Sequence, residues 1–97
     1  MADKKIVCDL NGITRPQFRE YINKRAALID ELGQPGLWDE NRETLDRFDW
    51  DNLYARVLVE WPYGAVTWEA YAALGMLDAK AVDEAVSDYM EALAKKN

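Results

Sequence analysis

Residues 14–35 read TRPQFREYINKRAALIDELGQP and contain both ends of one amphipathic helix. Thr14 is placed to cap it, a proline falls in its first turn, and Gln17 stands at the capping-box position. Apolar residues then recur at steps of three and four, and Gly33 with Pro35 ends the pattern. The segment therefore predicts a helix of about five turns.

The residues that follow contain a second helical stripe. Asp49 or Asp51 is placed to cap it, and Pro62 ends it. Its apolar positions, which we expect in the core, are Leu53, Tyr54, Val57, Leu58 and Trp61. The preceding residues 37–48 are polar and acidic, and their loosely spaced apolar positions suit a short helix or an ordered loop.

Two more helices are expected in the C-terminal third. Thr67 can cap a short helix that Gly75 ends, and Asp78 can cap a last helix whose final lysines suit the helix dipole. The apolar positions of this last helix are Val82, Ala85, Val86, Tyr89 and Leu93.

One strand is expected near the N-terminus. Residues 5–10 are rich in β-branched and apolar side chains and end at the turn Asn11-Gly12. Such a strand needs a partner, either within the chain or on another subunit. The sequence thus predicts a mainly α, small single-domain helical fold over 1–97, with four to five helices, one short N-terminal β-strand, and frayed ends at 1–4 and 94–97.

Composition narrows the classes of function. The 97 residues carry 18 acidic and 12 basic side chains, for a net charge of −6, which disfavours nucleic acids and anionic membranes. Much of the acidity lies in residues 38–60. The lone Cys8 cannot form an intrachain disulfide, and no apolar stretch approaches the roughly 20 residues of a membrane span. We therefore expect a soluble protein in a reducing, cytosolic compartment.

The sequence offers little for catalysis. Histidine, the commonest general base and metal ligand, is absent. Cys8, the remaining nucleophile candidate, falls in the expected strand, and adjacent carboxylates on a helix point about 100° apart. Asp46, Asp49 and Asp51 resemble part of a calcium loop but lack its central glycine and closing glutamate. We expect no enzyme, no metal site and no cofactor.

Aromatic residues gather in residues 38–71, about a third of the chain: Trp38, Trp50, Trp61, Tyr63, Trp68 and Tyr71. A domain this small can hardly bury four indoles, and Trp and Tyr are frequent interface anchors. We expect at least one of Trp50, Trp61 and Trp68 to be half-exposed. The predicted partner-binding residues are Trp50, Trp61, Tyr63, Trp68 and Tyr71.

Four motifs follow one another along the chain: KIVCDLNGIT at 5–14 with Phe18, VLVEW at 57–61, VTWE at 66–69 and AVDEAV at 81–86. In this order they resemble the tail assembly chaperones of long-tailed (siphovirus-like) bacteriophages. The resemblance implies a virion assembly factor in the host cell cytoplasm that binds the tape-measure protein and hands it to tail-tube subunits. It also implies self-association into a homo-oligomer, and a longer form made by ribosomal slippage near Lys95-Lys96. The acidic segment between Gly33 and Asp49 has no counterpart in the family.

Two other functions stay open on the residues alone. One is a small acidic phage-encoded inhibitor, either a DNA mimic or an anti-defence protein, and the other is a minor structural virion protein. A mimic of DNA needs a nearly uniform negative field. Arg42, Arg47 and Arg56 interrupt the acidic segment at helical spacing, which instead predicts intrahelical ion pairs.

Overall fold

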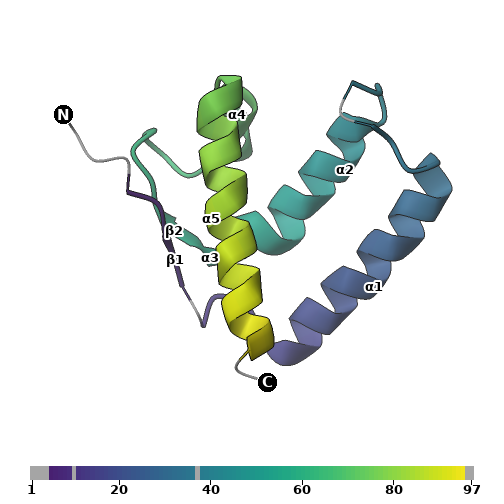
Figure 1. The fold of residues 1–97 in the computed structure, drawn as a ribbon, viewed down its shortest axis with the longest axis horizontal. Helices are drawn as coiled ribbons and strands as arrows, with labels where there is room; N and C mark the ends of the chain where they lie inside the picture. Colours follow the sequence, from purple (N-terminus) through teal and green to yellow (C-terminus); the bar gives the residue numbers. More distant parts are fainter. Residues whose placement is uncertain (1–4, 10, 37, 96–97) are drawn as a thin grey trace. The chain divides into compact units, whose positions relative to one another are not determined.

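The computed structural model describes residues 5–9, 11–36 and 38–95, and it is mainly α, as predicted (Figure 1). Its elements in chain order are β1 (Val7–Cys8), α1 (Arg15–Leu32), α2 (Arg42–Asp49), the π-helix η1 (Trp50–Tyr54), α3 (Ala55–Val57), β2 (Leu58–Glu60), α4 (Trp68–Ala72) and α5 (Met76–Lys95). Contacts divide the chain into two compact units. We name Ile13–Arg56 the α1–α2 unit, and Met1–Gly12 with Val57–Asn97 the sheet unit. The expected single domain over 1–97 stays a prediction.

Helix α1 has the ends that the sequence predicted. The Thr14 hydroxyl accepts from the Gln17 backbone N–H at 3.3 Å, and the Gln17 side chain accepts from the Thr14 backbone N–H at 3.0 Å, which completes the capping box. Gly33 ends the helix with φ +77°, and its N–H donates to the Ile29 carbonyl. Glycine adopts this left-handed conformation without the strain a side chain would add.

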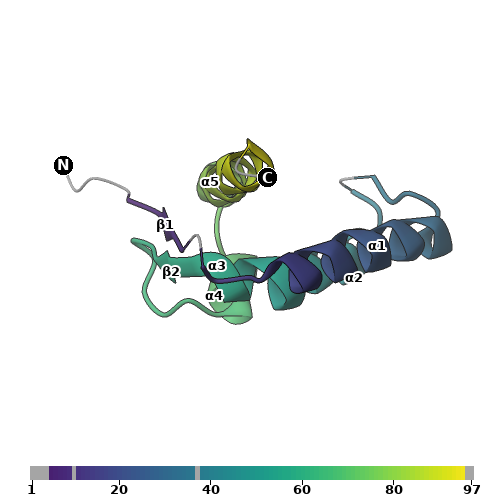
Figure 2. The same ribbon diagram turned by 90° about the horizontal axis from the view of Figure 1, so that it is seen from below.

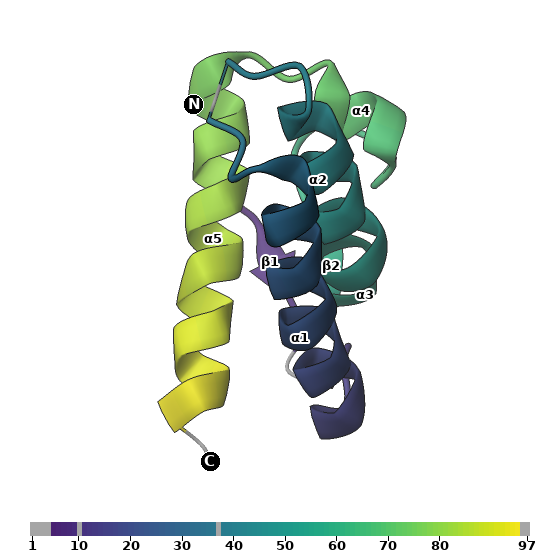
Figure 3. The same cartoon turned by 90° about the vertical axis from the view of Figure 1, so that its right-hand side faces the viewer.

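Helix α2 lies beside α1 in the α1–α2 unit (Figure 3). It forms where the sequence allowed a short helix or a loop. The Tyr21 ring of α1 stacks on the Phe48 ring of α2, with centroids 5.8 Å apart and planes 12° from parallel. The buried apolar side chains of this unit are Ile13, Tyr21, Leu45, Trp50 and Leu53. The predicted ion pairs are present for two of the three arginines, with Arg42 3.1 Å from Asp46 and Arg47 3.2 Å from Asp51. Arg56 forms no ion pair with another described residue.

The prediction of one helix from Asp49 or Asp51 to Trp61 is wrong for the residues after Val57. The chain leaves α2 through η1 and α3 and then forms β2 at Leu58–Glu60, while Asp49 makes no capping hydrogen bond. Strand β2 pairs antiparallel with β1, and the Asp9 N–H donates to the Val57 carbonyl at 2.8 Å (Figure 2). Pairing satisfies the backbone groups along the facing edges of the two strands and suits the β-branched valines, so it overrides the helical spacing.

The expected burial of this stripe holds in spite of the change of element. Leu53, Val57, Leu58 and Trp61 are buried, and Tyr54 is half-buried. The first strand finds its partner within the chain, one of the two arrangements that the sequence left open.

Helix α4 begins after Thr67, whose hydroxyl accepts from the Ala70 N–H at 3.2 Å, as predicted. Helix α5 begins two residues before the expected cap. The Ala79 N–H donates to the Gly75 carbonyl at 2.9 Å, so Gly75 takes the cap position and Asp78 lies in the first turn. The helix packs against β1 and buries Val82, Val86 and Tyr89.

The ends of the chain differ in part from the expected fraying. Helix α5 continues through Ala94 and Lys95. Residues 1–4 and 96–97, with Leu10 of the expected strand and Leu37 of the acidic segment, lie outside the described residues. The ribosomal slippage expected near Lys95-Lys96 depends on the codons for these residues, so it is tested by the gene sequence and not by the structure. Within the described part of the chain, no helix combines the length and apolar character needed to cross a membrane.

Candidate protein-binding surface

Two of the five predicted anchors, Trp50 and Trp61, belong to the core, with 4% and 6% of their surfaces exposed. Trp50 begins η1 and its ring lies 6.0 Å from that of Tyr54. Trp61 follows β2, and its indole N–H donates to the Gly64 carbonyl at 2.9 Å. Gly64 adopts φ +91°, which closes this turn. Both indoles help to hold their units together, and a direct role of either in binding stays a prediction.

The other three, Tyr63, Trp68 and Tyr71, are half-buried and all belong to the sheet unit. Of the three indoles among which we expected a half-exposed one, Trp68 alone is half-buried, and the other two are buried. Its ring lies 5.9 Å from that of Tyr71, and the Tyr63 ring meets Trp61 edge-on at 5.4 Å. The structure therefore brings the sheet-unit aromatics together in two pairs and leaves Trp50 in the other unit.

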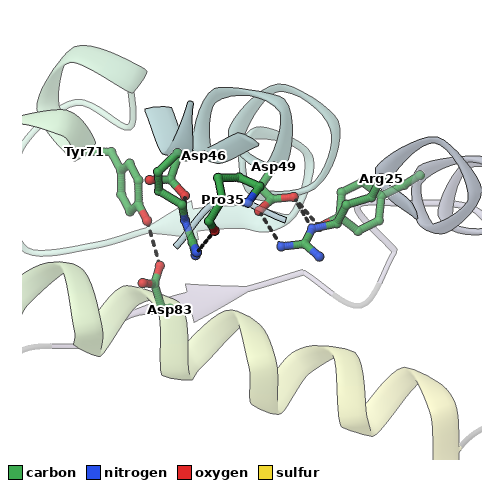
Figure 4. Close-up of polar contacts among 8 residues, drawn as sticks. Arg25, Pro35, Asp46, Asp49, Tyr71 and Asp83 are labelled. Atoms are coloured by element: carbon green, nitrogen blue, oxygen red, sulfur yellow. Dashed lines mark hydrogen bonds and ion pairs between the residues drawn. The ribbon is translucent and has the colours of Figure 1, made fainter. Parts of the chain in front are cut away.

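Two tyrosine hydroxyls connect this aromatic segment to α5. The Tyr71 hydroxyl donates to the Asp83 carboxylate at 2.7 Å (Figure 4), and the Tyr63 hydroxyl donates to the Asp78 carboxylate at 3.4 Å. A short hydrogen bond to a charged acceptor is stronger than one between neutral groups. These bonds fix α5 against the segment that precedes it.

The sequence reasoning missed Met76 and Leu77, which are 63% and 84% exposed at the start of α5. The missed signal was their place on the helix. At about 100° per residue, both fall on the side away from the buried Val82, Val86 and Tyr89. On that side lie seven exposed residues, which we call the α5 outer face: Met76, Leu77, Lys80, Glu84, Ser87, Asp88 and Glu91.

The α5 outer face lies in a segment with charge of nearly one sign. Residues 57–93 contain seven acidic side chains and one basic side chain, Lys80. The Lys80 ammonium is 4.0 Å from the Glu84 carboxylate, and both side chains are about two-thirds exposed or more. Such exposed pairs contribute little to stability. The result is a negative surface with two large apolar side chains at one end.

Among the described residues, the further exposed large apolar side chains are not adjacent to one another in the sequence. Trp38 is 84% exposed in the connection between α1 and α2, Ile22 is 42% exposed on α1, and Val59 is 58% exposed on β2. Isolated exposed apolar residues are common on protein surfaces. The pair Met76-Leu77 differs from them because its two members are adjacent and border an acidic face.

The most strongly coupled polar cluster lies in the α1–α2 unit. Asp49 accepts from the Tyr21 hydroxyl at 2.8 Å and from Arg25 at 2.7 Å and 3.3 Å (Figure 4). Burial, followed by the charge of Asp49, raises the pKa of Tyr21 well above its ordinary value, and the hydrogen bond to Asp49 raises the pKa of Arg25. Tyr21 and Arg25 keep their protons at neutral pH. The cluster therefore joins α1 to α2 and has no group poised for acid–base chemistry.

The other candidates for chemistry also have structural partners. Burial raises the pKa of the Cys8 thiol, which opposes formation of a reactive thiolate. Asp46, Asp49 and Asp51, the fragment of a calcium loop, each pair with a different arginine. Across the described ranges, no group of three or more His, Cys, Asp or Glu side chains is arranged to hold a metal ion.

No protein-family model matches the chain, and neither the curated proteins nor the solved structures show a significant similarity to it. The features that bear on function are therefore those of its own residues. Among them, the α5 outer face with the half-buried Tyr63, Trp68 and Tyr71 behind it is the best candidate for a binding surface.

Proposed function

We propose that the protein is a non-enzymatic protein-binding factor that acts in phage tail assembly by binding the tape-measure protein. The observation that carries the binding role is the exposure of Met76 and Leu77 beside the acidic residues of α5. Adjacent large apolar side chains on a surface rimmed by charge are typical of protein interaction sites. The tail-assembly role comes from the resemblance carried by the four motifs.

An assembly chaperone has to cover apolar helical surface on its client and release it later. Packing one helix face against another with a few apolar anchors does this. Charges around the anchors then set orientation and rate of association more than affinity, so that binding stays reversible. The α5 outer face has this composition, and α5 is fixed from behind by Tyr71 and Tyr63.

The acidic inhibitor is the second candidate, because residues 57–93 contain seven acidic side chains and one lysine. An inhibitor that mimics DNA would place this charge against the basic cleft of a nucleic-acid-binding protein. Met76 and Leu77 have no use in such a mimic, since the phosphate backbone presents no apolar anchor. This is the reason to favour the assembly role.

The test is coexpression with the tape-measure protein, a long helical protein that the proposal expects to be encoded next to this gene. We expect the two to elute together from a sizing column, and the long protein to aggregate when it is expressed alone. If the long protein remains in solution without this chain and no complex elutes, the assembly role is wrong. Displacement of a bound host protein by duplex DNA would instead favour the inhibitor.

A further inference from the structure

We infer that the α5 outer face binds a basic amphipathic helix of the partner protein. In this arrangement Met76 and Leu77 are the apolar anchors, while Glu84, Asp88 and Glu91 face lysine or arginine side chains of the partner. The inference rests on the proposed protein-binding function. It adds the chemistry of the partner helix and the residues of α5 that contact it.

The spacing of the outer face suits a helix lying along α5. Leu77, Glu84 and Glu91 recur every seven residues, the repeat along which two packed helices stay in contact. The distance from Leu77 to Glu91 is about 21 Å at 1.5 Å per residue, which corresponds to about four turns of a partner helix. Asp88 falls between the two glutamates on the same side. An anchor thus stands at one end, and Glu84, Asp88 and Glu91 follow it toward the other end.

The charge selects the partner. Lys80 is the one basic side chain between residues 57 and 93, so an acidic helix, a nucleic acid or an anionic lipid surface would be repelled. A second copy of the chain is also disfavoured, because each copy carries a net charge of −6. A helix with lysine or arginine beside its apolar stripe complements both features of the face.

The face is ready to bind without rearrangement. Asp78 and Asp83, which accept from Tyr63 and Tyr71, lie outside the outer face and position α5. The exposed pair between Lys80 and Glu84 is long, so its opening costs little. A face that is already fixed loses less conformational freedom on binding.

The test uses the full chain and a labelled synthetic helix of about three heptads, with leucine at positions a and d and lysine at e and g. Fluorescence anisotropy measures its dissociation constant at low and at physiological salt. A second peptide carries glutamate in place of lysine, and a third is a scramble of the first. Of the three peptides, we expect only the first to bind the chain. Its affinity should fall as the salt concentration rises, because salt screens the charges.

Two variants of the outer face should weaken this binding. E84Q/D88N/E91Q removes three exposed charges, and we expect roughly a tenfold loss of affinity and a smaller salt dependence. L77A removes the anchor, and we expect a loss of about tenfold or more. All four positions are exposed, so melting temperatures should change little.

Matched controls come from the α1–α2 unit. E31Q/E40Q/E43Q changes the net charge of the chain by the same amount at exposed positions, and I22A shortens another exposed apolar side chain. We expect each control to stay within about twofold of the unsubstituted chain, which corresponds to less than 0.5 kcal/mol. A loss in E31Q/E40Q/E43Q equal to that in E84Q/D88N/E91Q would mean attraction by net charge alone and would overturn the inference.

Other results separate this inference from the proposed function. If the lysine peptide fails to bind, or binds E84Q/D88N/E91Q and L77A as well as the unsubstituted chain, α5 is not the docking face. A dimer seen by sedimentation that dissociates in L77A would assign the face to a second copy and overturn the inference as well. If the peptide binds through α5 but no complex forms with the tape-measure protein, the docking chemistry stands and the assembly role fails.

Discussion

The two units of the chain differ in the balance of their acidic and basic side chains and in the pairing of these charges. In the α1–α2 unit nine acidic side chains alternate with seven basic ones, and the carboxylates of Asp46, Asp49 and Asp51 all contact arginines. In the sheet unit residues 57–93 carry seven acids and one lysine. The buried tyrosines follow the same division. The Tyr21 hydroxyl donates to Asp49, whereas the buried Tyr89 hydroxyl has no hydrogen-bond partner among the described residues.

This difference indicates where stability and binding are located. Interleaved charges and a partly buried cluster whose polar groups have partners favour a fixed structure. The exposed Glu84, Asp88 and Glu91 contribute little to folding, and proteins tend to depart from local stability rules at functional sites. The α1–α2 unit therefore has the features of a scaffold, and the sheet unit those of a binding region.

Asp49→Ala should have the largest effect on this comparison. It leaves the partly buried Arg25 guanidinium and the Tyr21 hydroxyl without their shared acceptor, and we expect a loss of about 3 kcal/mol in the free energy of unfolding. Urea denaturation followed by circular dichroism measures it. Asp51→Ala, which breaks an exposed pair, is the control and should cost less than about 1 kcal/mol. Equal losses in the two variants would show that the partly buried cluster contributes no more to stability than an exposed ion pair.

Tyr21→Phe should cost about 1.5–2 kcal/mol at neutral pH, because it removes a hydrogen bond to a charged acceptor. It should also change the response to alkali. The pKa of Tyr21 is raised in the folded state, so its contribution is full below the ordinary pKa near 10 and is lost as pH rises above it. Denaturant melts between pH 8 and about pH 11 should show a shallower decline in Tyr21→Phe. An unchanged slope would mean that Tyr21 does not titrate with unfolding.

Thr14→Ala should cost about 1 kcal/mol, because it removes the hydroxyl of a complete capping box on α1. Thr67→Ala is the matching change in the sheet unit. Thr67 caps the five-residue α4 through one hydrogen bond, and we expect about half the loss. Thermal melts of the two variants measure the difference. A larger loss in Thr67→Ala would place more of the stability in the sheet unit.

Tyr89→Phe should have the smallest effect, from no change to a gain of about 1 kcal/mol. It removes a buried hydroxyl that has no hydrogen-bond partner, while the ring stays in place. Denaturant melts of Tyr89→Phe and the unsubstituted chain measure the change in the free energy of unfolding. A loss above 1 kcal/mol would reveal an acceptor for the hydroxyl and would weaken the contrast with Tyr21.

Local chemistry in the sequence was enough to predict several elements. The Thr14 and Thr67 caps, the stop at Gly33 and the buried Val82 and Val86 all follow from interactions within a few residues or from a 3.6-residue period. The ion pairs of Arg42 and Arg47 likewise follow from spacing within one helical stretch. Such features need no knowledge of what lies across the fold.

Other features depend on residues far away in the sequence and follow from packing. Leu58–Glu60 became a strand because β1, about fifty residues earlier, pairs with it, and Asp49 became the partner of Tyr21 and Arg25 because α1 packs beside α2. The exposure of aromatic residues was decided in the same way. Trp61 and Trp68 have the same side chain, yet Trp61 is buried and Trp68 is half-buried. Burial is set by the elements that surround a side chain and not by its own chemistry.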